Sequence, residues 1–185
     1  DARYLIWQPD VEITFSDYTI APDAKAKDLS ARHGIGTVSV IELLRIVDIP
    51  KRKRDLKDHP ERWYIAPAFC RKCSSLTSED PTGLKHDRLY FDLSELAARY
   101  ARMRMDSLYA QDPADNFASI WLETVCSDAD EMMHRMFNTY GREVVLTRSD
   151  SAYASWRTFT DEMLAMRPDN TTKAEDRQRF MSGSP

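Results

Sequence analysis

Near the N-terminus, hydrophobic and polar residues alternate along the chain. Val11, Ile13 and Phe15 are separated by single polar residues, which is the period of a strand that buries one face. A lone strand is not stable by itself. The pattern therefore predicts an extended N-terminal arm over residues 4–20. The arm would pair either with the rest of this chain or with another chain.

Two segments that follow the arm predict helices. One covers residues 24–33 and ends at Gly34, which can adopt a left-handed cap. The other begins near Ser39, where Glu42 completes a capping box, and ends before Pro50. Its apolar residues cover most of the helix circumference, which indicates burial on several sides. Its β-branched residues leave a buried strand as the alternative. Residues 1–49 are thus expected to be an extended arm plus buried helices.

Residues 50–91 have a different pattern, because no helical stripe in them lasts longer than two turns. Turn-forming residues interrupt them at Pro50, Pro60, Pro67, Pro81 and Gly83. A structureless stretch of this length is uncommon inside a compact domain, and its aromatic content is too high for a solvated linker. We expect a Pro-rich segment that wraps over the body of the protein, a partner or a metal.

The clearest helical signals lie in residues 92–167, where four amphipathic helices are expected. Their predicted starts are Asp92, Asp112-Pro113, Ser127 or Asp128, and Ser149 or Asp150. The last helix has an apolar stripe of Ala152, Trp156, Phe159, Met163 and Met166. Short connections make such helices antiparallel neighbours, in a bundle or in stacked pairs. Residues 168–185 form a polar tail, either unstructured or docked.

The sequence therefore predicts a mainly α fold with an extended arm, a Pro-rich middle segment and a C-terminal four-helix unit. Helical repeats are an alternative for that unit, but the aromatic residues keep no fixed period of the kind that repeats need.

Composition narrows the class of protein. The chain has 185 residues, of which 42% are hydrophobic and 30% charged, enough for a core and unlike a disordered chain. The net charge is −4, and all of it lies in residues 93–185, which carry 11 basic and 15 acidic side chains. A dedicated nucleic-acid binder has a basic excess instead. No apolar run is long enough for a membrane span.

The candidate chemistry centres on a Cys-x-x-Cys pair, Cys70 and Cys73, flanked by His59 and His86. Two thiolates on one turn with two imidazoles could complete a tetrahedral zinc site. The order of the ligands is not that of a common zinc finger, so a surface loop without a metal is the preferred interpretation. A dithiol redox pair is the least favoured alternative, because the residues that follow do not form a helix pattern. The third cysteine, Cys126, makes the count odd, which argues against a secreted disulfide scaffold.

A basic run at residues 51–57 could contact nucleic acid, anionic lipid or an acidic partner, or be a solvated loop after a helix. Gly34-Ile35-Gly36 lacks the third glycine that a phosphate-binding loop needs. His134 lies among methionines whose spacing is typical of a helix core. No catalytic motif is present, so no catalytic residue is assigned and the sequence favours a protein that is not an enzyme.

The first half of the chain is typical of a segment that lies on other proteins, because its apolar surfaces are costly in a free monomer. The expected docking residues are Trp63, Tyr64, Phe69, Val40, Leu43 and Leu44. We expect an accessory subunit of a large assembly, such as a mitochondrial respiratory or ATP-synthase complex, with other protein subunits as partners.

The chain begins at Asp1, which would fit an intracellular, mitochondrial protein after removal of a presequence. The alternative function is a small binding module stapled by zinc at His59, Cys70, Cys73 and His86, which would contact nucleic acid or an acidic partner. Apart from this structural zinc, no cofactor is expected.

Overall fold

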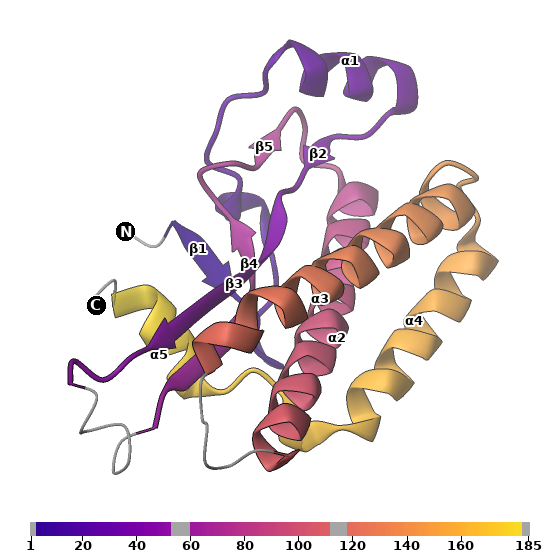
Figure 1. The fold of residues 1–185 in the computed structure, drawn as a ribbon. Helices are drawn as coiled ribbons and strands as arrows, with labels where there is room; N and C mark the ends of the chain where they lie inside the picture. The colour runs from indigo at the N-terminus through magenta and orange to yellow at the C-terminus, as the bar shows by residue number, and fades with distance from the viewer. Residues whose placement is uncertain (1–2, 53–59, 112–117, 183–185) are drawn as a thin grey trace.

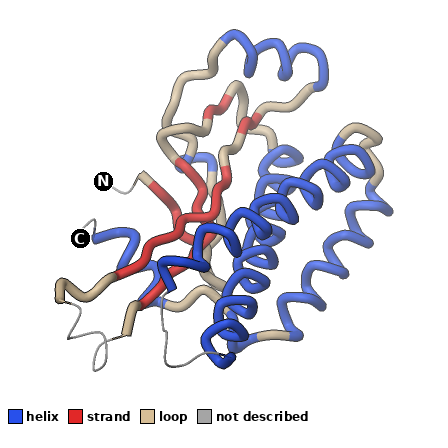
Figure 2. The backbone as a smooth tube through the Cα atoms, viewed as in Figure 1, coloured by secondary structure: helices blue, strands red, loops and turns tan. Residues whose placement is uncertain are grey.

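The protein is mainly α-helical, with helices around a small antiparallel sheet (Figure 1; Figure 2). The computed structural model describes residues 3–52, 60–111 and 118–182. The α-helices in this part are α1 (Ala24–His33), α2 (Pro81–Gln111), α3 (Ala118–Tyr140), α4 (Asp150–Met166) and α5 (Ala174–Ser182). Short helical turns are η1 (Phe15–Asp17), the π-turn η3 (Gly141–Val145) and η4 (Pro168–Asn170). The strands are β1 (Tyr4–Ile6), β2 (Thr37–Val38), β3 (Ile41–Asp48), β4 (Arg62–Cys70) and β5 (Ser75–Leu76).

The prediction of a helix after Ser39 is wrong, because the segment forms strand β3. A buried strand was the alternative that its β-branched residues indicated. Strand β3 pairs antiparallel with β4, and β1 adds to the other edge of β4. Leu43 faces α2 and α3, whereas Leu44 packs beside Phe180 of α5 on the opposite face. Both faces of the strand are therefore covered, which explains why its sequence is apolar all round.

The N-terminal arm pairs within the chain, since Tyr4 lies opposite Cys70 and Ile6 opposite Ala68. The expected strand around Val11 is wrong: that stretch is a loop leading into η1. Ile13 is nonetheless fully buried and its neighbours are exposed. The alternation thus predicted the burial of Ile13 correctly. Among the described residues, however, no strand lies beside this stretch to form hydrogen bonds with it.

The Pro-rich segment contains more regular structure than its prolines suggest. Its centre is β4, and its end is the first part of α2, which begins at Pro81 rather than at Asp92. Asp80 caps this helix by accepting a hydrogen bond from the Thr82 backbone N at 3.0 Å. Proline fits the first turn of a helix, so Pro81 starts α2 and does not interrupt it.

The four-helix layout expected for residues 92–167 is not found in the described residues, which hold α2, α3 and α4 there. Ser127 and Asp128 lie inside one continuous α3, where both are exposed and cost the helix little. The proposed start at Asp112-Pro113 lies outside the described residues. Helices α1 and α4 match expectation: Gly34 caps α1 with a φ of 66°, and the Ser149 side chain accepts from the Ala152 backbone N.

The C-terminal segment is held to α2 by a buried ionic network. Glu95 is fully buried, and its carboxylate accepts hydrogen bonds from Arg99 at 2.9 Å and from Arg102 at 3.2 Å. The backbone N of Thr172 donates to the same carboxylate at 2.9 Å, and the Thr172 hydroxyl donates at 2.5 Å. A buried carboxylate with four donors is fully compensated for the loss of water.

The two arginines extend this network to other elements. Arg102 donates to the carbonyl of Ile65 in β4 at 2.7 Å and to that of Asn170 in η4 at 2.7 Å. Arg99 donates to the carbonyl of Leu164 near the end of α4 at 2.5 Å. The network therefore joins α2 to the sheet, to the C-terminus of α4 and to η4.

We predict that Glu95→Ala destabilises the fold by about 3–5 kcal/mol, because it leaves two buried guanidinium groups without a counter-charge. Glu95→Gln, which keeps an acceptor oxygen, should lose less stability than Glu95→Ala. The control is Asp28→Ala, since the Asp28–Arg32 pair is exposed and should contribute less than about 1 kcal/mol. Urea unfolding measures all three, and a loss in Glu95→Ala as small as that of the control would contradict the prediction.

Candidate functional site

Helix α4 exposes a row of large apolar side chains. Phe159, Met163 and Met166 are 44%, 39% and 71% exposed. They follow Trp156 at spacings of three and four residues, so the four side chains lie along one side of the helix. Trp156 is half-buried, and its ring lies 5.6 Å from that of Tyr140 at the end of α3. The row therefore starts at the contact between α4 and α3 and runs along α4 away from it.

Helices α2 and α3 continue the apolar surface. In α2, Leu96, Tyr100 and Met103 are half-buried at the same helical spacing. In α3, Met132 is half-buried and Trp121 is exposed. Helix α4 packs on α2 and η3, and Figure 1 shows α3 and α4 diverging from the turn that joins them. The open helical face, as we name this surface, comprises Leu96, Tyr100, Met103, Trp121, Met132, Trp156, Phe159, Met163 and Met166.

Acidic side chains border the open helical face on α3 and α4. Asp128 is exposed on α3, seven residues after Trp121 and four before Met132, so it lies in line with them. Glu162 is exposed on α4 beside Met163. Farther along α3, Glu131 and Arg135 lie 3.6 Å apart and largely cancel each other's charge. The border is therefore acidic, in agreement with the negative charge of residues 93–185.

Chemically, the open helical face offers hydrophobic contact and no reactive group. Three helices with an apolar surface between two of them form an incomplete bundle, and a further helix is the element that completes such packing. An amphipathic helix laid into an apolar surface is also a common mode of peptide recognition. The arrangement is therefore suited to binding a helix.

The sequence predicts the apolar stripe of α4 but not its exposure, because the periodicity shows which side of a helix is apolar and not what covers it. The docking residues expected from the sequence lie elsewhere. Phe69 and Leu43 are buried in this chain's own core, and Leu44 packs near α5. Trp63 and Tyr64 are half-buried on β4, and Val40 is exposed before β3.

Three of the four expected zinc ligands, Cys70, Cys73 and His86, lie in the described residues, where they make other contacts. Cys70 and Cys73 form a disulfide at the end of β4, and His86 lies on α2 with its Nδ1 atom 2.5 Å from the Tyr140 hydroxyl. His59 lies outside the described residues, as do residues 53–57 of the basic run. No group of three or more potential ligands is found in the described part of the chain. The zinc site stays a prediction.

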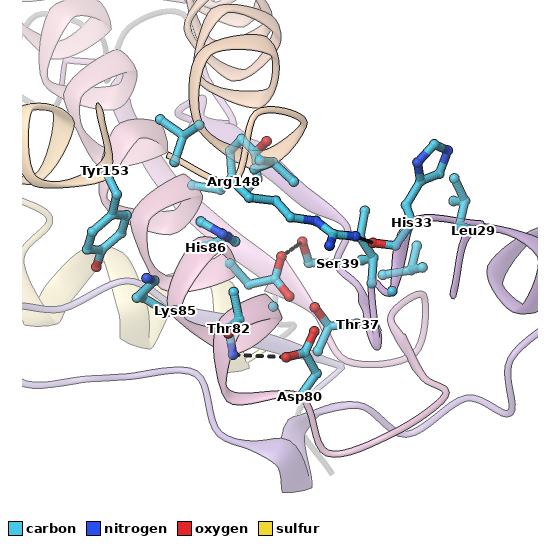
Figure 3. A pocket seen from close by; sticks show the side chains of 18 of the residues that line it. Leu29, His33, Thr37, Ser39, Asp80, Thr82, Lys85, His86, Arg148 and Tyr153 are labelled. Atoms are coloured by element: carbon cyan, nitrogen blue, oxygen red, sulfur yellow. Dashed lines mark hydrogen bonds between the residues drawn. The ribbon is translucent and has the colours of Figure 1, made fainter. Parts of the chain in front are cut away.

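A cleft, which we name the polar cleft, lies where α1, the start of α2 and the start of α4 approach one another (Figure 3). Its volume is about 680 Å³, within the range of small-molecule sites. Lys85, His86 and Arg148 line it together with Ser39 and Tyr153. Burial and the adjacent Lys85 lower the pKa of His86, so its imidazole is neutral near pH 7.

Asp87 is the most buried acid of the polar cleft. Its carboxylate accepts hydrogen bonds from the hydroxyls of Ser39 and Tyr18, both at 2.6 Å. No lysine or arginine among the described residues forms an ion pair with it. Burial therefore dominates and raises the pKa of Asp87.

Comparison with known proteins identifies no relative, since no family model, curated protein or solved structure matches the chain. The function must therefore be argued from the geometry described above.

We predict that Asp87→Asn gains stability relative to the natural protein as the pH rises. The pKa of Asp87 is raised in the folded state, so the folded state binds more protons than the unfolded chain above about pH 3.9, and stability is lost from there up to the raised pKa. Tyr18→Phe removes one donor to the carboxylate and should widen this interval. Urea unfolding between about pH 4 and pH 7 measures the difference, and a difference that does not vary with pH would refute the prediction.

We predict an order of thiol reactivity. Without reductant, iodoacetamide should label none of the three cysteines of the folded protein, because Cys70 and Cys73 are bonded and Cys126 is buried. After reduction, the exposed Cys73 should react first. Cys126 should react only on unfolding, because burial raises its pKa to about 12. Mass spectrometry locates the labels, and stoichiometric zinc in the unreduced protein would instead favour the metal site.

Proposed function

We propose that the protein is a non-catalytic accessory subunit of a larger assembly, and that it binds an amphipathic helix of a partner protein on the open helical face. The observation that carries the proposal is the exposed row of Phe159, Met163 and Met166 on α4. Contiguous apolar surfaces of this kind are rare on free monomers and mark sites of interaction.

The form of the partner follows from the helices that make the surface. Leu96, Tyr100 and Met103 run along α2 between the apolar sides of α3 and α4, so the surface is long in the direction of a helix. A helix with apolar residues three and four positions apart would contact all three elements. Met side chains adapt to the shape of such a ligand.

The charge of the partner follows from the border of the surface. Asp128 on α3 and Glu162 on α4 would lie beside the two flanks of a bound helix. Lysine or arginine on those flanks would be attracted, and acidic helices would be repelled. We therefore propose a basic amphipathic helix. No helix in the described residues is long and apolar enough to cross a membrane.

The membership of a mitochondrial respiratory or ATP-synthase complex, expected from the sequence, is retained as part of the same proposal. Fractionation of the source cells tests it separately from helix binding, since the open helical face would serve an assembly in any compartment.

We predict that Met166→Glu, alone or with Phe159→Glu, releases the protein from its assembly. A buried carboxylate without a partner opposes binding, whereas the exposed positions of both side chains should leave the fold intact. The matched control is Met181→Glu, because Met181 on α5 is 51% exposed and Met166 71%. The variants are expressed in the source cells, and their native size is measured by native gel electrophoresis of a mild-detergent extract.

The natural protein and Met181→Glu should migrate in a complex, and Met166→Glu should migrate near 21.4 kDa. Circular dichroism of the purified variants checks that they are folded. Migration of the natural protein near its own mass would overturn the proposal, as would the same release in Met181→Glu.

A further inference from the structure

The polar cleft is independent of the open helical face and carries a separate inference. It lies between the loop after α1, the first turns of α2 and the turn before α4. Figure 3 shows Lys85 and His86 on one side of it, Asp80 and Thr37 on another, and Arg148 extending across it toward His33. The charged groups around it differ in whether their hydrogen-bonding atoms already have partners within the protein, and this difference indicates a ligand.

The carboxylates of the polar cleft are occupied by donors of the protein itself. Asp80 accepts hydrogen bonds from the backbone N of Gly36 at 3.2 Å and of Thr82 at 3.0 Å. Asp87 accepts from the two hydroxyls described above. Asp150 is almost fully exposed to solvent. Among these three acids, Asp150 forms an ion pair with a cation of the cleft, Lys85, at 3.8 Å, and the oxygens of Asp80 and Asp87 are occupied by neutral donors.

The cations of the polar cleft lack such partners. Arg148 donates from Nη2 to the His33 carbonyl at 3.0 Å, and within the described ranges no carboxylate forms an ion pair with it. Lys85 lies over the Tyr153 ring, with its Nζ atom 4.2 Å from the ring centre. The nearest acid to Lys85 is the solvent-exposed Asp150 at 3.8 Å, a pair that contributes little. Arg148 and Lys85 thus keep free N–H donors, whereas the oxygens of Asp80 and Asp87 already accept hydrogen bonds from the protein.

The backbone of Arg148 supports a role for its side chain. Its φ is 53°, and among the residues that the structure describes it is the one non-glycine residue with positive φ. Glycine or asparagine adopts this conformation at lower cost than arginine does. An unfavourable backbone conformation kept at a cavity is typical of functional sites, and here it directs a guanidinium group across the polar cleft.

Part of the lining is apolar or aromatic. Ile35, Val38 and Val144 contribute aliphatic surface, and Tyr90 and Tyr153 contribute rings. Cavities that bind organic molecules combine such surface with a few polar groups that fix the orientation of the ligand.

We propose that the polar cleft binds a small organic anion, whose carboxylate or phosphate group contacts Arg148 and Lys85 and whose apolar part packs against Tyr153 and the valines. Arginine and lysine both bind these groups, arginine through paired hydrogen bonds. The inference does not depend on the proposed partner helix, because the two surfaces share none of the residues that define them.

The experiment is a titration of the full ¹⁵N-labelled chain, followed by amide chemical shifts. The probes are phenyl phosphate, benzoate and, as a neutral control, benzyl alcohol. One or both anions should cause saturable shifts at Gly34, Gly36 and Gly83 with a Kd of roughly 1 mM or lower. A response to phenyl phosphate alone assigns a phosphate ligand, and a response to benzoate alone assigns a carboxylate.

Variants distinguish direct contact between the ligand and Arg148 or Lys85 from a general effect of the protein's charge. Arg148→Asn should weaken binding about tenfold or more, which corresponds to the loss of one charge-assisted contact, and should keep or raise the thermal stability because asparagine tolerates the backbone conformation. Lys85→Met should also weaken binding. The control is Arg142→Asn, since Arg142 is exposed on the π-turn η3 shortly before Arg148 and does not line the polar cleft.

Absence of saturable shifts with both anions would overturn the proposal. Equal binding of benzyl alcohol would show that no anionic group is recognised and would overturn it too. Equal weakening in Arg142→Asn would assign the effect to net charge instead of the polar cleft, with the same consequence.

Discussion

Glu95 and its donors form the interaction on which the rest of the structure depends. One buried carboxylate joins Arg99 and Arg102 on α2 to the backbone of Thr172, and the arginines in turn hold β4 and the end of α4. Removing any member would leave a buried charge or donor unpaired, which costs more than the pair itself contributes. The network therefore fixes where the C-terminal segment lies.

That constraint has consequences for the open helical face. Because Arg99 binds the carbonyl of Leu164, the C-terminal end of α4 is fixed to α2 and not to α3. In the first half of α4, Trp156 contacts Tyr140. The apolar side chains that follow, Phe159 and Met163, are partly exposed, and no element in the described part of the chain covers them. An exposed apolar surface thus results from the contacts that fix α4 to α2.

The polar cleft also depends on α4, at the N-terminal end of this helix. Arg148 lies in the turn that leads into α4, and Lys85 and His86 lie in the first turns of α2. The positions of both elements are set by the core around Leu89, Leu93 and Tyr140. Sites built on the ends of packed helices are held more rigidly than sites on long loops, which is why a strained residue such as Arg148 can be kept in place.

Much of the local structure could be read from the sequence because its causes are local. The cap at Gly34 and the start of α4 at Ser149 depend on residues within one helical turn, and the apolar stripe of α4 depends only on spacing. The sequence also predicted correctly that Ile13 is buried, because its burial does not depend on whether its backbone pairs with another strand.

By itself, the sequence determined that the chain is mainly helical, where α1 and α4 begin and end, and which side of α4 is apolar. The tertiary structure alone decided that residues 41–48 form a strand, because that depends on pairing with β4 and on cover from both faces. It also decided that the stripe of α4 is exposed and that Arg148 reaches the polar cleft. Periodicity states which residues avoid water, but what they meet depends on contacts between residues far apart in the chain.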